Sequence, residues 1–541
     1  MEELDFSGLL ANCSDKGRTG YNPIMMYAVV TYANMRGIRS VDRIVDLCER
    51  DLAFIWLTRG QKPKRDAFYD FKNRKLTSDI LDDLNYQFMR RLQKEGLVTL
   101  KELFIDGTKI EANANRYTFV WRGSINYHLA GLLDSIDQLF EKYNSFLQEN
   151  DYGTKYELGN AQMFVIEGMD KVREVIEKNR KRKLVKHKKL SNNRIIEIDN
   201  CSPLEIRKLQ NNLTMIADNE EIEFVYGKGK RKPAIQQLHE ELEQCGKRLM
   251  EYKECFEIMG KDRNSYSKTD LEATFMRMKE DHMLNGQLKP AYNVQIAVEN
   301  YFIVHGYVSS DRTDYNTLIP VLEKHKNAFG RILEEVTADS GYCSEKNLLY
   351  LKQNEISSYI KLQDHEKRKT RAYSEDISKY YNMRTGIFED EQFYICHDGR
   401  ELRHLRTESK EQDGYTQIFE VYGCADCSGC EHKVRCLYKY DAEKDAEKNK
   451  VMKINEQWEE LKERSHANIQ SERGILKRQT RSIQTEGHFG DIKENENFRR
   501  FNYRSADKVY KEFMLYAIGR NINKYHRFLY EKLRKFEGKT A

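Results

Sequence analysis

The sequence has few prolines, no long apolar run and almost no excess of charge of either sign. Only six prolines occur in 541 residues, so long proline-rich linkers are absent. No stretch approaches the roughly 18 consecutive apolar residues that a membrane-spanning helix needs. The start, MEELDFSGLL, is acidic and lacks the charge pattern of a signal peptide. We therefore expect a cytoplasmic protein without membrane contact.

Two further features limit the kinds of ligand that we expect this protein to bind. The formal net charge is only +5, which favours an anionic partner slightly and leaves local clusters to decide. No GxxxxGK[ST] motif is present, so no nucleotide cofactor is expected. The sequence does contain 39% hydrophobic and 11% aromatic residues, enough to build buried cores. A chain of 541 residues predicts three or four domains, or one domain with large insertions.

The first 96 residues predict short helices joined by tight turns. Gly37 ends one helix, and Ser40 occupies the N-cap position of the next. A basic stretch, KRDAFYDFKNRK, follows at 64–75. Such an arrangement is typical of a helix-turn-helix-like DNA-binding domain, and the alternative is a helical cap with a solvated basic face. The candidate DNA contacts in this stretch are Lys64, Arg65, Lys72 and Arg74.

Residues 113–285 predict a large helical insertion. It contains a heptad seam of Ile235, Leu238, Leu242, Cys245, Leu249, Tyr252 and Phe256. The seam fits either a helical hairpin within the chain or a contact between two chains. Basic runs at 178–189 and 227–233 are either solvated or bind phosphate.

Strand-like segments flank that insertion and predict an α/β fold. Without it, the order is three strands, helix, strand, helix, strand and helix, which is the order of a ribonuclease H-like mixed sheet. The expected segments are a helical N-terminal DNA-binding domain (1–96), core strands (97–112 and 286–362), the helical insertion (113–285), an irregular Cys-rich insertion (363–450) and C-terminal helices completing the core (451–541).

Three carboxylates fall at related places in this order. Asp106 is predicted to end the first core strand, Asp339 the fourth, and Glu486 lies on a late helix. Individually they fit an Asp-Gly turn, a helix N-cap and a surface ion pair. Together they predict a metal-binding triad, because adjacent carboxylates need a cation. Hard oxygen ligands favour Mg²⁺ or Mn²⁺, and phosphodiester chemistry favours two such ions.

The segment around Glu486 carries basic and aromatic residues. Lys493 lies seven residues after Glu486, so a regular α-helix would place both on one face. Arg481 lies upstream of Glu486 in the same segment. We predict that Lys493 and Arg481 lie next to DNA phosphates.

Several motifs resemble those of bacterial insertion-sequence transposases of the DDE class. They are FIDGTKIEANAN, KEDHMLNGQLKPAYNVQIA, DRTDYNTLIP, TADSGY and RSIQTEGHFGDIKENENFRRF, with YNPIMMYAVVTYANMRGIRS and IWLTRGQKP near the start. The resemblance implies that Asp106, Asp339 and Glu486 bind metal and that Lys493 contacts DNA near the element end. A Tyr and an Arg found upstream of the Glu in a wider set of transposases are replaced here by Gln479 and Ser482.

The resulting hypothesis is a DNA transposase of a mobile element. It would bind the terminal repeats and target DNA as a homodimer, cleave a phosphodiester and join the freed 3′-OH to the target, completing DNA transposition, a form of DNA recombination. One alternative is a catalytically inactive DNA-binding regulator derived from a transposase. Another is a ribonuclease H-like nuclease that does not transfer strands.

A second motif, CADCSGCEHKVRC, concentrates cysteines in the predicted irregular insertion. Cys424, Cys427, Cys430 and Cys436 have the spacing of a structural Zn²⁺ site. The spacing is compressed, so Cys396 or His432 is an alternative to one of these four ligands. Free thiols and a redox role are the other interpretations.

Overall fold

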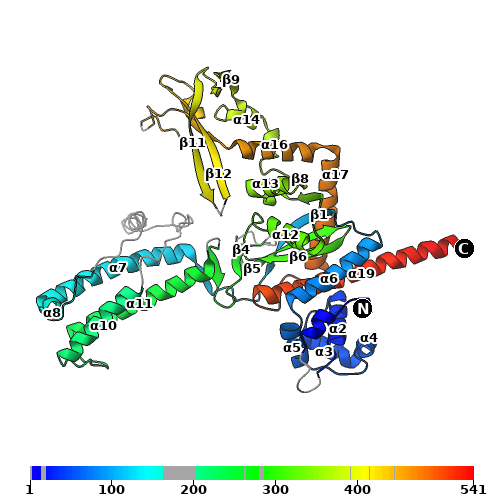
Figure 1. Ribbon diagram of the computed structural model, residues 1–541, viewed down its shortest axis with the longest axis horizontal. Helices are drawn as coiled ribbons and strands as arrows, with labels where there is room; N and C mark the ends of the chain where they lie inside the picture. The colour runs from blue at the N-terminus through cyan, green and yellow to red at the C-terminus, as the bar shows by residue number, and fades with distance from the viewer. Residues whose placement is uncertain are drawn as a thin grey trace.

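The computed structural model describes residues 3–13, 20–161, 203–260, 263–278, 286–389, 391–412, 415–443 and 445–540. A central α/β body carries two arms, one of long helices and one of long strands (Figure 1). No helix in these ranges combines the length and the apolar character that crossing a bilayer would require. The basic run at 178–189 lies outside the described residues.

The central sheet has the predicted ribonuclease H-like order. Its strands are β4 (Thr274–Arg277), β1 (Glu102–Glu111), β5 (Leu288–Glu299), β6 (Phe302–Ser309), β7 (Glu335–Ala338) and β8 (Ser357–Ile360). β5 pairs antiparallel with β1, β6 and β4, whereas β1, β7 and β8 are parallel. The expected mixed sheet, with a hairpin followed by alternating helices and strands, is therefore confirmed.

Helices cover both faces of this sheet. Leu103 and Ile105 of β1 pack in a core with α12 (Leu318–Phe329) and α13 (Glu345–Gln353). On the other face, Val294 and Ile296 of β5 pack against α19 (Ala506–Thr540). The remaining C-terminal elements are α16 (Glu456–Gln470), α17 (Glu472–Arg481), η7 (Ser482–Glu486), α18 (Gly487–Gly490) and η8 (Asp491–Asn495).

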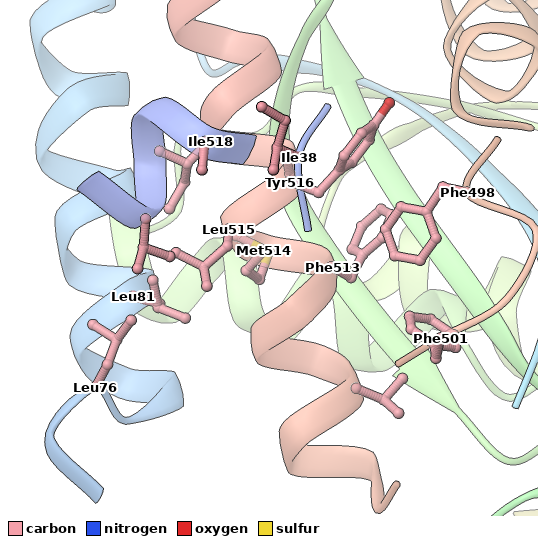
Figure 2. Packing of buried hydrophobic residues seen from close by; sticks show 14 of the residues in the cluster. Ile38, Leu76, Leu81, Phe498, Phe501, Phe513, Met514, Leu515, Tyr516 and Ile518 are labelled. Carbon is pink, nitrogen blue, oxygen red and sulfur yellow. The ribbon is translucent and has the colours of Figure 1, made fainter. Parts of the chain in front are cut away.

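The N-terminal helices dock onto the middle of α19. They are α1 (Ser7–Ala11), α2 (Pro23–Met35), α3 (Val41–Arg50), α4 (Leu52–Leu57), α5 (Arg65–Asp70), η1 (Phe71–Lys75) and α6 (Ser78–Lys94). Ser40 caps α3 as expected, because its Oγ accepts from Arg43 N. Figure 2 shows Ile38, Leu76 and Leu81 around the α19 residues Met514, Leu515 and Ile518.

The helical insertion forms its own bundle. It contains α7 (Arg122–Glu149), α8 (Tyr152–Lys155), α10 (Pro203–Asn219) and α11 (Ala234–Met259), and β2 (Phe119–Trp121) pairs with β3 (Ser265–Ser267) at its base. Leu238, Leu242 and Leu249 are buried against α7 and α10. The heptad seam is thus a contact within the chain, the first of the two alternatives.

The segment predicted to be irregular is instead largely a five-stranded antiparallel sheet. Its order is β13 (Val451–Ile454), β12 (Tyr415–Cys424), β11 (Glu401–Gln412), β10 (Glu391–Ile395) and β9 (Arg384–Phe388). Short helical turns, η5 (Lys367–Lys369), α14 (Arg371–Ser374), η6 (Tyr380–Asn382) and α15 (Lys433–Cys436), surround it. β11 reads ELRHLRTESKEQ and is mostly exposed, so it lacks the apolar alternation that identifies a strand from sequence. Pairing with β12 along its length stabilises it instead.

We predict that Gly519→Ala weakens the docking of the N-terminal helices. A Cβ at Gly519 would lie 2.6 Å from Met35 N, so α2 and α19 must separate. Overpacking of this kind costs about 1–3 kcal/mol. The midpoint of chemical unfolding should fall, and proteolysis should release the N-terminal helices faster.

The matched control is Gly131→Ala, in the interior of α7, where a Cβ meets no atom within 4 Å. It should leave stability unchanged or raise it by about 0.5–1 kcal/mol. Equal effects of the two substitutions would contradict close packing of α2 on α19.

A buried histidine pair predicts a loss of stability in mild acid. His325 Nε2 donates to Leu100 O at 2.9 Å, so its Nδ1 accepts from His305 Nε2 at 2.8 Å. Burial lowers the pKa of His325 to about 4 and that of His305 well below its usual value. The unfolded chain takes up these protons below its pKa of about 6.5, whereas the folded chain does not. Stability should therefore be complete above about pH 6.5 and fall toward about pH 4.

The slope should be roughly 1.4 kcal/mol per pH unit and per histidine within that window. Unfolding midpoints measured from about pH 7 to about pH 5 test this, with the His305→Gln/His325→Gln double variant as the control. The wild type should lose more stability than the variant. Parallel pH profiles would refute the assignment.

Candidate active site

β1 continues through Asp106, contrary to the prediction that this residue ends the strand. Asp106 and the residues up to Glu111 pair with β5. What ends here is the pairing with β7, whose last partners are Ile105 and Ala338. The Asp-Gly turn interpretation is also wrong, because Gly107 lies within the strand.

Asp339 follows β7 directly and is exposed to solvent. Ile105 and Ala338 are register partners in parallel strands, so Asp106 and Asp339 follow at the same level. Ile105 and Ala338 both pack in the α12–α13 core. Side chains alternate along a strand, so the next residues, Asp106 and Asp339, are directed toward the other face. Asp339 makes no capping hydrogen bond to η4 (Ser340–Tyr342), which excludes the N-cap interpretation.

Helix α17 and η7 present a row of donors to this face at intervals of four residues. Arg473 contacts Glu335 at 2.5 Å, and Lys477 contacts Glu335 at 2.7 Å and Glu102 at 2.5 Å. Arg473 and Lys477 lower the pKa of Glu335 although burial opposes them. The row continues with Arg481 and Thr485, which reach β1 at the level of the predicted site.

Arg481 joins two of the three predicted acids. Its Nη1 lies 3.0 Å from Asp106 Oδ2, and its Nη2 lies 3.9 Å from Glu486 Oε1. Thr485 Oγ1 donates to the same Asp106 oxygen at 3.1 Å, and Gly107 N donates to Asp106 Oδ1 at 2.8 Å. The Glu486 side chain is 63% exposed. A positive charge therefore lies between Asp106 and Glu486.

The pKa of Tyr342 depends on the charges of this site. Its pKa is raised well above its usual value, mainly by burial and then by the carboxylates of Asp314, Asp106 and Asp339, while Arg481 opposes them. The phenol thus stays protonated beneath the acids. Asp106 and Asp339 thus both act on Tyr342, and Arg481 links Asp106 to Glu486.

Below the acids lies a buried polar network that the sequence did not predict. Tyr342 donates to Gln295 Oε1, and Gln295 Nε2 donates to Asp314 at 2.9 Å. Asn293 Nδ2 also donates to Asp314, at 2.8 Å. A Cβ at Gly107 would collide with the Gln295 amide, so glycine is required beside Asp106. The two polar residues of the NVQ stretch in β5, Asn293 and Gln295, were the sequence signal that could have indicated this network.

The end of the Glu486 segment differs from the regular α-helix that was expected. Its π-helical pieces η7 and η8 change the side-chain spacing. Lys493 is buried whereas Glu486 is exposed, so the two do not share a face. The prediction that Lys493 lies next to DNA phosphates is therefore corrected, because its side chain is in the interior. His488 is buried as well, within 2.9 Å of Tyr301 O, and burial lowers its pKa to about 4.

The basic N-terminal stretch is divided between the surface and the interior. Lys64, Arg65 and Arg74 are exposed and form ion pairs with Glu49, Asp42 and Asp70. Lys72 is buried beside the Tyr503 ring, and burial lowers its pKa to about 8. The prediction that Lys72 contacts DNA is therefore corrected: it helps dock η1 near Glu512 of α19.

The predicted zinc cysteines gather in the five-stranded sheet region. Cys424, Cys427, Cys430 and Cys436 line one small cavity, together with Cys396 and His432. Across the described ranges, no three His, Cys, Asp or Glu side chains stand in a finished metal-binding arrangement. This holds for the cysteines and for Asp106, Asp339 and Glu486.

Comparison with known proteins supports the class predicted from the motifs. A transposase DDE domain family matches residues 395–526, and a family described as transposase domain (DUF772) matches residues 2–74. The first match includes Glu486 but neither Asp106 nor Asp339. Neither the curated proteins nor the solved structures give a match. The two family matches support an insertion-sequence transposase of the DDE class.

Transposases of this kind act on DNA, and DDE domains generally use divalent metal ions. The donor set agrees with such ions in part: Asp106 and Asp339 are carboxylates at one level of adjacent strands, and Glu486 lies beyond Arg481. In this structure the guanidinium of Arg481 provides the positive charge beside the Asp106 carboxylate.

Proposed function

We propose that this chain cleaves a phosphodiester at each end of a mobile element and transfers the freed 3′-OH to target DNA. The observation that supports this most is that Asp106 and Asp339 follow paired residues of adjacent parallel strands, while Arg481 contacts Asp106 and lies 3.9 Å from Glu486. These acids are separated by 233 and 147 residues in the sequence. Asp339 and Glu486 are exposed, so a large substrate can reach them from solvent.

Asp106, Asp339 and Glu486 are the proposed ligands of two Mg²⁺ or Mn²⁺ ions. Such ions, when bound, neutralise phosphoryl oxygens and favour formation of the nucleophile. Thr485 and Gly107 N hold the Asp106 carboxylate in a fixed orientation through two hydrogen bonds. Tyr342 and Gln295 support the strand beneath it. In this proposal Arg481 contacts a DNA phosphate once it leaves Asp106.

Double-stranded DNA is the proposed partner of the N-terminal helices as well. Lys64, Arg65 and Arg74 have side chains that are 60–84% exposed, and their partners are surface carboxylates in weak exposed pairs. Phosphates can replace those carboxylates at little cost. Transposition joins two element ends, so we propose a homodimer on DNA.

We predict that Asp339→Asn abolishes cleavage without abolishing DNA binding. The substitution removes a carboxylate from an exposed position where no hydrogen bond caps η4, so folding should be intact. Cleavage of a duplex bearing the flanking element end, with Mg²⁺ or Mn²⁺, should fall roughly 10²–10³-fold. Strand-transfer products in the same assay separate a transposase from a nuclease.

The matched control is Glu334→Gln, an exposed carboxylate just before β7 that pairs with Lys101. It should retain wild-type cleavage. Tight DNA binding with no cleavage in any metal, identical in wild type and Asp339→Asn, would favour the inactive DNA-binding regulator instead.

A second prediction concerns Arg481. Its positive charge competes with a cation for Asp106, so Arg481→Gln should raise the affinity for Mn²⁺ about tenfold, or ~1.4 kcal/mol. The same variant should cleave DNA more slowly, because a phosphate contact is lost. Electron paramagnetic resonance of free Mn²⁺ measures the affinity. The control is Arg473→Gln, because Arg473 lies on the same helix as Arg481 but pairs with Glu335. This variant should leave the Mn²⁺ affinity unchanged. An unchanged Mn²⁺ affinity in both variants would disprove the competition.

A further inference from the structure

The cysteine cavity is independent of the proposed DNA chemistry. Its volume is about 20 Å³, which is enough for one small occupant. Five cysteines line it, and they come from two separate segments of the chain. Cys396 follows β10, Cys424 ends β12 with Cys427 and Cys430 in the next loop, and Cys436 ends α15.

Backbone contacts shape the two loops that carry these cysteines. Cys396 N donates to Arg400 O, and Gly399 N donates back to Cys396 O, both at 2.9 Å, which closes a tight turn. Arg400 then donates to Asp426 O and Ser428 O, each at 2.8 Å. The turn of Cys396 is thereby clamped to the loop of Cys427 and Cys430.

The sulphurs differ in the hydrogen bonds they make. Lys450 N donates to Cys427 Sγ at 3.4 Å. Cys424 behaves oppositely, because its thiol donates to Asp426 O at 3.2 Å.

Cys436 lines the same cavity as Cys396, Cys427 and Cys430. Four thiolates this close together repel one another unless a cation lies among them. Soft thiolate ligands in a set of four select tetrahedral zinc.

We propose that Cys396, Cys427, Cys430 and Cys436 bind one structural Zn²⁺ and that Cys424 does not. Cys396 thus replaces Cys424 in the set predicted from sequence. The four sulphurs turn into the cavity by rotation about their Cα–Cβ bonds, and binding releases their thiol protons to solvent without any change of oxidation state. The ion ties two segments together where the local apolar cluster is small. The buried members of that cluster are Tyr394, Leu402, Tyr422, Cys424, Cys427, Met452 and Ile454.

The test measures zinc in the purified full-length chain by inductively coupled plasma mass spectrometry. Wild type and Cys424→Ser should each hold about one Zn²⁺ per chain, whereas Cys396→Ser should lose most of it. Replacement by Co²⁺ should give the thiolate charge-transfer absorption of a tetrahedral site in the first two proteins only. Loss of zinc from Cys424→Ser with retention in Cys396→Ser would overturn the ligand assignment. Wild-type protein without zinc or a Co²⁺ spectrum would overturn the site.

A measurement on the wild type guards against misfolding of the variants. Cys396 and Cys430 are partly exposed, so a maleimide should label both after treatment with a chelator and neither when zinc is restored. Equal labelling with and without zinc would refute the proposal. These readouts do not depend on cleavage, so they stand or fall separately from the proposed function.

Discussion

Carboxylates on β1 and β7 require positive charge beside them, and the arrangement of the C-terminal helices satisfies that requirement. Glu102 and Glu335 face Lys477, Arg473 also reaches Glu335, and Asp106 faces Arg481. Because the basic residues recur every four positions, a single helix face serves both strands. At the far end of this row, the positive charge of Arg481 lies between Asp106 and Glu486.

The site is supported from below as well as from the side. Gln295, Asn293, Asp314 and Tyr342 form a hydrogen-bonded layer within the sheet and its following loops. A polar network of this kind is stable only if its members are satisfied, and it then fixes the strands that carry the acids. The N-terminal helices depend on α19 in a similar way: Arg39 of the loop after α2 contacts the buried Glu512 at 2.9 Å. The candidate DNA-binding surface and the sheet are therefore joined through one helix.

Much of the fold could be predicted from local sequence. Apolar runs with turn residues between them indicated the core strands, the heptad spacing indicated α11, and Ser40 marked the start of α3. The strands of the distal sheet could not be predicted in this way. β11 is charged and exposed on most of its length, so its conformation depends on its partner β12 rather than on burial of its own side chains.

The sequence by itself determined the order of strands and helices around the central sheet, the positions of the three acids and the cysteine motif, because these depend on residue type and spacing. Only the tertiary structure decided which charged residues face inward. Lys72 and Lys493 lie in basic stretches whose other lysines and arginines are mostly exposed, so nothing in the sequence distinguishes them, yet packing buries both. Arg481 and Thr485 reach Asp106 because α17 and η7 cross β1, and Cys396 joins the other cysteines because β10 ends beside the β12 loop. Such contacts between distant segments leave no periodic trace in the sequence, so the fold alone specifies them.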